Sequence, residues 1–134
     1  MTERGKIRNR NYASQLRDFS GLRFGNITPT DIDGFIEFGD KLYIIIESKY
    51  RDTEMPYGQE LALTRLCQRI AASGRPCYLL IVTFKNGMGD IKYAQTIVAR
   101  YMYDGDWHVP KAETTLKQAI DILYHKHIKL DVAV

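Results

Sequence analysis

The sequence predicts an α/β fold in which a central mixed β-sheet is flanked by helices, and two observations lead to it. Near the middle of the chain a helix-like segment, 59–72, separates two apolar strand-like segments, 41–50 and 77–84. Further helix-like segments lie near the two ends, at 7–19 and 113–127. A strand–helix–strand unit with additional helices is typical of a mixed sheet that has helices on both faces.

The first half of the chain alternates helical and extended patterns. Residues 7–19 repeat apolar side chains at helical spacing, which predicts an amphipathic helix. The segment GLRFGNI, 21–27, is consistent with a short strand. Residues 31–38 and 41–50 have the pattern of two strands joined around Gly39-Asp40, which is a hairpin signal.

The second half contains two helices and three strands by the same criteria. Residues 59–72 place apolar side chains on one stripe, which predicts a helix. The run CYLLIVTF, 77–84, is continuously apolar and fits a strand buried on both faces. Residues 95–103 and 106–109 form a second candidate hairpin, and 113–127 predicts a final helix.

Length and composition indicate a single domain over residues 1–134. Hydrophobic residues make up 45% of the chain and charged residues 26%, as in ordinary globular proteins. We find no apolar block that resembles a signal peptide and no segment long enough to span a membrane. We therefore expect a cytoplasmic protein without a membrane partner, in which Cys67 and Cys77 are buried free thiols.

Basic side chains concentrate near the N-terminus. The first 25 residues carry six basic and two acidic side chains, whereas the net charge of the whole chain is only +3. Such a segment either follows phosphates or forms the solvated face of a helix. The basic residues are Arg4, Lys6, Arg8, Arg10, Arg17 and Arg23.

Charged residues also occur at the ends of the apolar hairpin. Glu47 and Lys49 project to the same side of the second strand, because side chains alternate along a strand. A two-residue turn would place Asp33 and Glu47 on opposite faces, whereas a three-residue loop, 39–41, would set them opposite each other. The longer loop would also set Asp31 opposite Lys49. We expect this second register, because it gathers costly charges into one cluster.

Two carboxylates on adjacent strands form an oxygen-rich site of the kind that Mg²⁺ prefers. The candidate protein ligands are Asp33, Glu47 and the backbone carbonyl of Ser48. The ammonium of Lys49 would lie beside them, where it could orient a water and offset negative charge on a phosphate.

These residues resemble the signature of the PD-(D/E)xK nuclease superfamily. The signature places an acid on one strand and then acid–any residue–lysine on the next; here TDIDG is followed by ESK, with 14 residues from Asp33 to Glu47. A helix and a buried strand follow, as in the α-β-β-β-α-β core of that family. The resemblance implies a restriction-endonuclease-like fold with a core at about 7–84 and a C-terminal extension at about 91–134.

Carried over one residue at a time, the resemblance assigns a role to each member of the cluster. Asp33 matches the first metal-binding acid, with Asp31 as the alternative, and Glu47 matches the second. Lys49 matches the catalytic lysine. Gln59, in GQELAL, resembles a glutamine that supports the site or contacts the DNA backbone, although a helix also commonly begins with such a residue.

The resemblance implies a DNA endonuclease that requires Mg²⁺, which Mn²⁺ can replace, and that leaves a 5′-phosphate and a 3′-hydroxyl. The implied partner is duplex or branched DNA, and the implied role is DNA repair or recombination. A chain this small covers little DNA, so we expect a homodimer or a larger complex. The expected nucleic-acid contacts are Arg4, Lys6, Arg8, Arg10, Tyr12 and Arg51.

The chain departs in one respect from the Holliday junction resolvase and virus-type replication-repair nuclease branches. Their first helix carries a glutamate that reaches the metal, where this chain offers Asn11 and Gln15. Two other interpretations therefore stand beside the nuclease. One is a non-catalytic nucleic-acid-binding or interaction module on the same fold. The other is an α/β domain without phosphate chemistry, in which Glu47 and Lys49 form a surface ion pair.

Overall fold

The computed structural model describes residues 18–50, 55–85 and 89–129. Nearly all of the predicted helix 7–19 lies outside these ranges. Contacts divide the chain into two units, Met1–Asp31 and Ile32–Val134. None of the described helices is long and apolar enough to cross a membrane.

The described part of the first unit is a pair of turns rather than a strand. A short 3₁₀ helix, η1, covers Ser20–Leu22. Phe24 and Ile27 then exchange backbone hydrogen bonds of 2.8 and 2.9 Å across a tight turn, in which Gly25 has a φ of 62°. The prediction of a strand at 21–27 was therefore wrong, because these residues pair only with each other in an isolated bridge.

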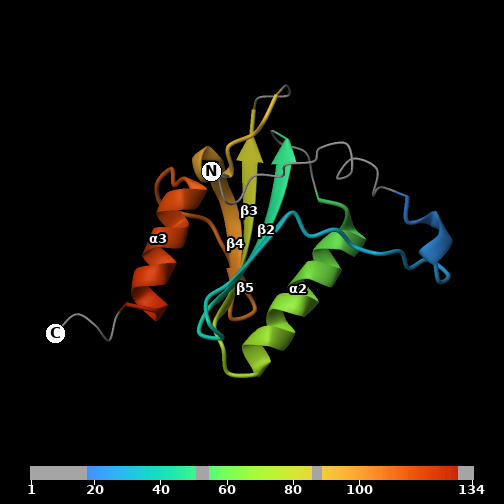
Figure 1. Cartoon of the computed structure of the whole chain (residues 1–134), viewed down its shortest axis with the longest axis horizontal. Helices are drawn as coiled ribbons and strands as arrows, with labels where there is room; N and C mark the ends of the chain where they lie inside the picture. The colour runs from blue at the N-terminus through green and yellow to red at the C-terminus, as the bar shows by residue number, and fades with distance from the viewer. Residues whose placement is uncertain (1–17, 51–54, 86–88, 130–134) are drawn as a thin grey trace, which may run out of the picture. The chain divides into compact units, whose positions relative to one another are not determined.

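The second unit contains a five-stranded mixed sheet, as predicted (Figure 1). The strands lie side by side in chain order, with β2 and β3 parallel and the other neighbouring pairs antiparallel. The parallel pair requires a crossover connection, and the helix between β2 and β3 provides it. The strands are β1 (Gly34–Glu37), β2 (Tyr43–Tyr50), β3 (Cys77–Phe84), β4 (Ile97–Tyr103) and β5 (Asp106–His108).

Two α-helices cover opposite faces of the sheet (Figure 1). Helix α2 (Tyr57–Ala72) connects β2 to β3, and a short 3₁₀ helix, η2 (Tyr93–Gln95), precedes β4. Helix α3 (Leu116–His127) begins three residues later than predicted, because Thr115 caps it. The Thr115 hydroxyl accepts from the Gln118 amide at 3.1 Å, and the Gln118 side chain accepts from the Thr115 amide at 2.9 Å.

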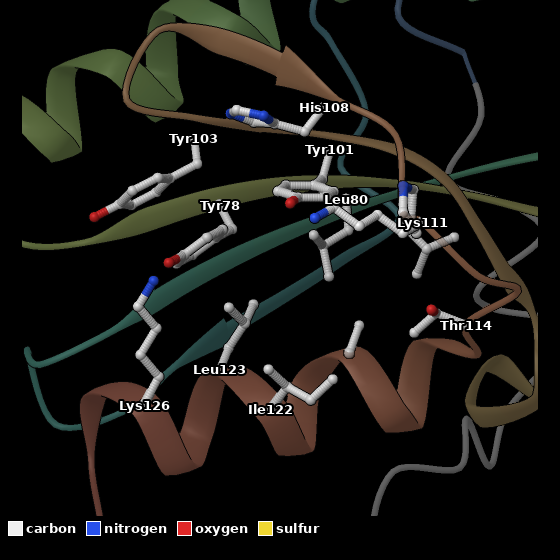
Figure 2. Close-up of a pocket in the computed structure, with 13 residues that line it drawn as sticks. Tyr78, Leu80, Tyr101, Tyr103, His108, Lys111, Thr114, Ile122, Leu123 and Lys126 are labelled. Carbon is white, nitrogen blue, oxygen red and sulfur yellow. The ribbon is translucent and has the colours of Figure 1, made fainter. Parts of the chain in front are cut away.

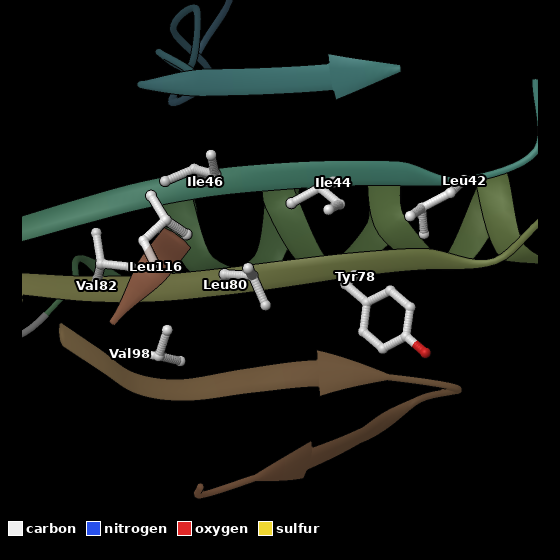
Figure 3. Close-up of a cluster of buried hydrophobic side chains, with 8 residues drawn as sticks. All are labelled: Leu42, Ile44, Ile46, Tyr78, Leu80, Val82, Val98 and Leu116. Atoms are coloured by element: carbon white, nitrogen blue, oxygen red, sulfur yellow. The ribbon is translucent and has the colours of Figure 1, made fainter. Parts of the chain in front are cut away.

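Alternate residues of β2 and β3 fill two separate apolar cores. On the α3 face, Ile44 and Leu80 pack with Leu116 of α3 (Figure 3). On the α2 face, Ile45 and Leu79 pack against the helix. The remaining buried members of the first core are Leu42, Ile46, Tyr78, Val82 and Val98, and those of the second are Leu63, Cys67, Cys77, Ile81 and Met102. The two cysteines are free and buried, as predicted.

The β1–β2 hairpin has the predicted register. Phe38 faces Leu42 across a three-residue loop, with a 2.9 Å bond from the Phe38 amide to the Leu42 carbonyl. The paired strands follow the same alignment, from Glu37 opposite Tyr43 to Gly34 opposite Ile46. Both Gly39 and Asp40 have positive φ, 55° and 63°, and this conformation matches the twist of the strands that the loop joins.

Strand β1 is shorter than the predicted segment 31–38, and Asp33 accounts for its start. Main-chain bonds in an antiparallel pair recur at every second residue, so the Ser48 amide would next bond the carbonyl of Ile32. It instead donates to the Asp33 carboxylate at 2.8 Å. The side chain of Asp33 therefore replaces the next main-chain hydrogen bond of the β1–β2 pair, so Gly34 is the first residue of β1.

We predict that Gly39→Ala destabilises the protein by about 1 kcal/mol, because a Cβ is strained at positive φ. Gly58→Ala is the matched control. Gly58 lies in α2, and beyond its chain neighbours and its own helix no atom lies within 4 Å of the position that a Cβ would take, so alanine should be neutral or stabilising there. Urea unfolding measures both variants, and equal stability of Gly39→Ala and the wild type would contradict the loop geometry.

Candidate functional site

The end of β2 places two charged side chains on the α2 face of the sheet. Glu47 and Lys49 follow Ile45 at alternate positions, and Ile45 belongs to the core on that face. Glu47 is a buried acid with only 2% of its side chain exposed, whereas 16% of the Lys49 side chain is exposed. Burial of an acid at this depth is costly unless a cation or a proton accompanies it.

Lys49 pairs with only one of the two carboxyl oxygens of Glu47. The Lys49 ammonium lies 3.0 Å from Glu47 Oε2. The other carboxyl oxygen, Oε1, is buried and has no hydrogen-bond partner among the described residues. Native proteins pair nearly all such atoms, so this oxygen points to a partner beyond the protein side chains.

Gln59 fixes the ammonium of Lys49 from the other direction. Its side-chain oxygen accepts from Lys49 Nζ at 3.0 Å. Gln59 lies in the first turn of α2, so the start of this helix meets the end of β2 at the lysine. The long side chain of Lys49 is thus held between two acceptors, and the role of Gln59 in supporting a catalytic site stays a prediction.

Asp33 approaches from the residue before β1. Its Oδ2 accepts from the Ser48 amide at 2.8 Å and from the Ser48 hydroxyl at 2.9 Å. The Ser48 hydroxyl lies 3.0 Å from the hydroxyl of Tyr93 in η2. Asp33 itself is exposed, so the cluster opens to solvent on its side.

The two carboxyl groups influence each other. The pKa of Glu47 is raised to about 7, first by burial and then by the Asp33 carboxyl, which can accept a hydrogen bond from Glu47 only when Glu47 is protonated, while the Lys49 ammonium acts in the opposite direction. Two acids that face each other without a donor between them need a shared proton or a bound cation. Burial is also the largest cause of the raised pKa of Tyr93.

The structure brings Asp33, Glu47, Lys49 and Gln59 together, but it does not describe every predicted site residue in one place. Asp31 is exposed and belongs to the first unit, and its role as an alternative metal ligand stays a prediction. The role of the Ser48 carbonyl as a ligand stays a prediction. Outside the described residues lie Arg4, Lys6, Arg8, Arg10, Tyr12 and Arg51.

Two contributions to the cluster were missed by sequence reasoning. The Ser48 side chain and Tyr93 anchor Asp33, yet Ser48 and Tyr93 are 45 residues apart. The only available signal was the position of Ser48 between Glu47 and Lys49. Nothing in the segment around Tyr93 indicates a contact with β2.

The donor set suits a hard cation that keeps much of its own hydration. Among the described residues, no group of three or more His, Cys, Asp and Glu side chains could hold a metal ion. Mg²⁺ commonly takes only one or two carboxylates and fills its remaining positions with waters and phosphate oxygens. Asp33 and Glu47, with Glu47 Oε1 unpartnered, fit that requirement.

In comparisons with known proteins, no family model, no curated protein and no solved structure matches the chain. The site must therefore be interpreted from its geometry and its chemistry.

We predict that the metal-free protein loses stability as the pH rises from about 5 to 7. The folded-state pKa of Glu47, about 7, exceeds the ordinary value of 4.5, so the folded state binds more protons in this interval. Stability from this group is complete below 4.5 and is lost as the pH passes 7, a change of about 2 to 3 kcal/mol. Glu47→Gln should remove this decline in urea unfolding with EDTA present.

Glu113→Gln, at an exposed position, is the control for that measurement and should retain the wild-type decline. If the wild type and Glu47→Gln lose stability equally over this interval, Glu47 is not the group responsible.

Proposed function

We propose that this chain is a metal-dependent DNA nuclease with a restriction-endonuclease-like fold. The observation that carries the proposal is the convergence of Asp33, Glu47 and Lys49 at one end of a hairpin, with the buried Glu47 Oε1 unpartnered. An ordinary surface ion pair would leave both partners in water, whereas Glu47 is almost completely buried.

In this proposal Asp33 and Glu47 hold Mg²⁺ through their carboxylates, and Mn²⁺ can replace it. When bound, the ion would polarise the phosphate and make a water more acidic. Asp33 is oriented for this by its two bonds to Ser48, which leave its side chain little rotational freedom. Second contacts of this kind keep a metal ligand in position.

Lys49 would act beside the attacking water. Its ammonium is held by Glu47 and Gln59, both at 3.0 Å, so its charge has a defined location before substrate binds. A fixed positive charge next to the attacked phosphate stabilises the transition state without reorganisation. Gln59 acts through Lys49 and is therefore a positioning residue.

The arrangement of elements supports the same proposal. A hairpin, a crossover helix and a buried parallel strand, β1–β2–α2–β3, follow one another as in the last four elements of the core that the motif implies, whereas residues 21–27 do not supply the strand that precedes them in that core. We propose duplex or branched DNA as the substrate, cut internally to leave a 5′-phosphate and a 3′-hydroxyl. A homodimer or a larger complex would supply the additional DNA-binding surface.

A non-catalytic DNA-binding module is the second candidate. It is favoured by the small donor set, because the described residues offer two carboxylates and the predicted first helix offers Asn11 and Gln15 where related branches have a glutamate. The two candidates differ in one observable, namely cleavage.

We predict that the wild type cleaves duplex, single-stranded or branched DNA in Mg²⁺ or Mn²⁺, and not in EDTA. Lys49→Ala and Glu47→Gln should each lower the cleavage rate by about 100-fold or more, as losses of transition-state stabilisation do. Lys41→Ala, at the far end of the same hairpin, and Glu113→Gln are matched controls and should cleave at the wild-type rate.

DNA cleavage at the wild-type rate by both Lys49→Ala and Glu47→Gln would contradict the nuclease proposal. Salt-sensitive DNA binding without cleavage under all of these conditions would favour the binding module instead.

We further predict that Gln59→Ala lowers kcat by about tenfold with little change in KM, since it frees the lysine without removing it. Gln59→Glu retains an oxygen acceptor for Lys49 Nζ and should recover most of the rate. Cleavage kinetics on one substrate measure both variants. A rise in KM with unchanged kcat would show that Gln59 contacts DNA rather than positioning Lys49.

A further inference from the structure

A cavity lies on the opposite face of the sheet from the candidate nuclease site. It has a volume of about 410 Å³ and is formed between α3 and strands β3, β4 and β5 (Figure 2). Its size is within the range of small-molecule sites in proteins. Because β2 and β3 alternate between the two faces, the cavity shares no lining residue with the nuclease cluster.

On the side of the sheet, the cavity is lined by aromatic rings. Tyr78 and Tyr103 are stacked, with ring centroids 4.3 Å apart and an angle of 10° between the rings. Tyr101 lies opposite His108 in the β4–β5 ladder, and their rings are stacked at 5.1 Å. Figure 2 shows these two stacked pairs on the side of the cavity opposite α3.

The charged lining of the cavity is entirely basic. Lys111 and Lys126 both line it, together with His108, and none of its 13 lining residues is acidic. Both lysine side chains point into the cavity from different parts of the chain (Figure 2). Lys126 Nζ lies over the Tyr103 ring, 5.7 Å from its centre, and makes a cation–π contact with it.

A simple packing gap does not account for these features. Dry gaps in a protein core are lined by apolar side chains. Here two exposed lysines line the cavity, and Ile122, which also lines it, is 61% exposed. His127 donates or accepts in a 2.8 Å bond with the Tyr78 hydroxyl, which fixes that ring in place.

The geometry points to this cavity as a binding site for a nucleotide, with the base on the tyrosine and histidine rings and the phosphate on Lys111 and Lys126. Every base has a flat face that stacks on aromatic side chains, and the negative phosphate complements a lining without acids. Thr114, which precedes the cap residue of α3, donates its hydroxyl proton to the Ala112 carbonyl at 2.8 Å, and its oxygen can accept from a hydroxyl of the sugar. The nucleotide is either free or one unit of a single-stranded nucleic acid.

Isothermal titration calorimetry of the full chain in EDTA tests this site without DNA cleavage. The probes are deoxyadenosine monophosphate, deoxyadenosine, inorganic phosphate and a short oligodeoxyadenylate. Tight binding of the mononucleotide indicates a free nucleotide as ligand, whereas binding of the oligonucleotide alone indicates a single strand. The nucleoside and inorganic phosphate should each bind at least about tenfold more weakly, because each makes only part of the contacts.

Variants separate this cavity from the rest of the surface. Tyr101→Leu should weaken binding at least about fivefold through lost stacking. The double variant Lys111→Ala/Lys126→Ala should weaken it about tenfold, and its exposed positions leave the fold intact. Lys117→Ala on the outer side of α3 and Tyr57→Leu at the start of α2 should bind as the wild type does.

Three results would overturn the inference: no binding of either nucleotide probe, inorganic phosphate that binds as tightly as the nucleotide, or binding unchanged in the double lysine variant. Because binding is measured in EDTA without cleavage, and the variants that should weaken it all line the cavity on the α3 face, the inference can fail independently of the nuclease proposal.

Discussion

The register of the β1–β2 hairpin is the constraint on which the candidate site depends. Phe38 and Leu42 close a three-residue loop, and every pairing that follows has the same parity. A shift by one residue would turn the side chains of one strand to the other face and would separate Asp33 from Glu47. Gly39 and Asp40 secure this parity, because both adopt the positive φ that a tight, strongly twisted hairpin loop requires.

Asp33 converts that register into a site. By accepting from the Ser48 amide, its carboxylate replaces a main-chain bond and ends the β1–β2 ladder where the cluster begins. This hydrogen bond also places the exposed acid Asp33 beside the buried acid Glu47. Lys49 forms an ion pair with one oxygen of Glu47, and the other oxygen has no partner among the described residues. The hydrogen bond that ends β1 thus also brings the two carboxyl groups together. Because they lie close to each other, the pair needs a cation or a proton.

The extent to which this could be predicted from sequence depends on how local each signal was. The hairpin register was predictable, because parity and the cost of scattered acids can be argued from adjacent segments. Helix α2 followed from its apolar stripe, whereas the start of α3 was misplaced, because the apolar spacing does not show where the helix begins and the capping box of Thr115 with Gln118 sets its first residue. The Ser48–Tyr93 contact joins residues 45 apart, and no local pattern encodes it.

The alternation of β2 and β3 also explains how one small sheet can accommodate both proposed sites. Odd-numbered residues such as Ile45, Glu47 and Lys49 turn to α2, while Ile44, Tyr78 and Leu80 turn to α3. The apolar members of each set keep water out of the sheet between them, so charge at one face is separated from the other by a packed core. A cation at Glu47 and a phosphate at Lys111 would therefore lie on opposite sides of this core and would not contact each other. The same strands contribute side chains to both proposed sites, and each site is bordered by a different helix.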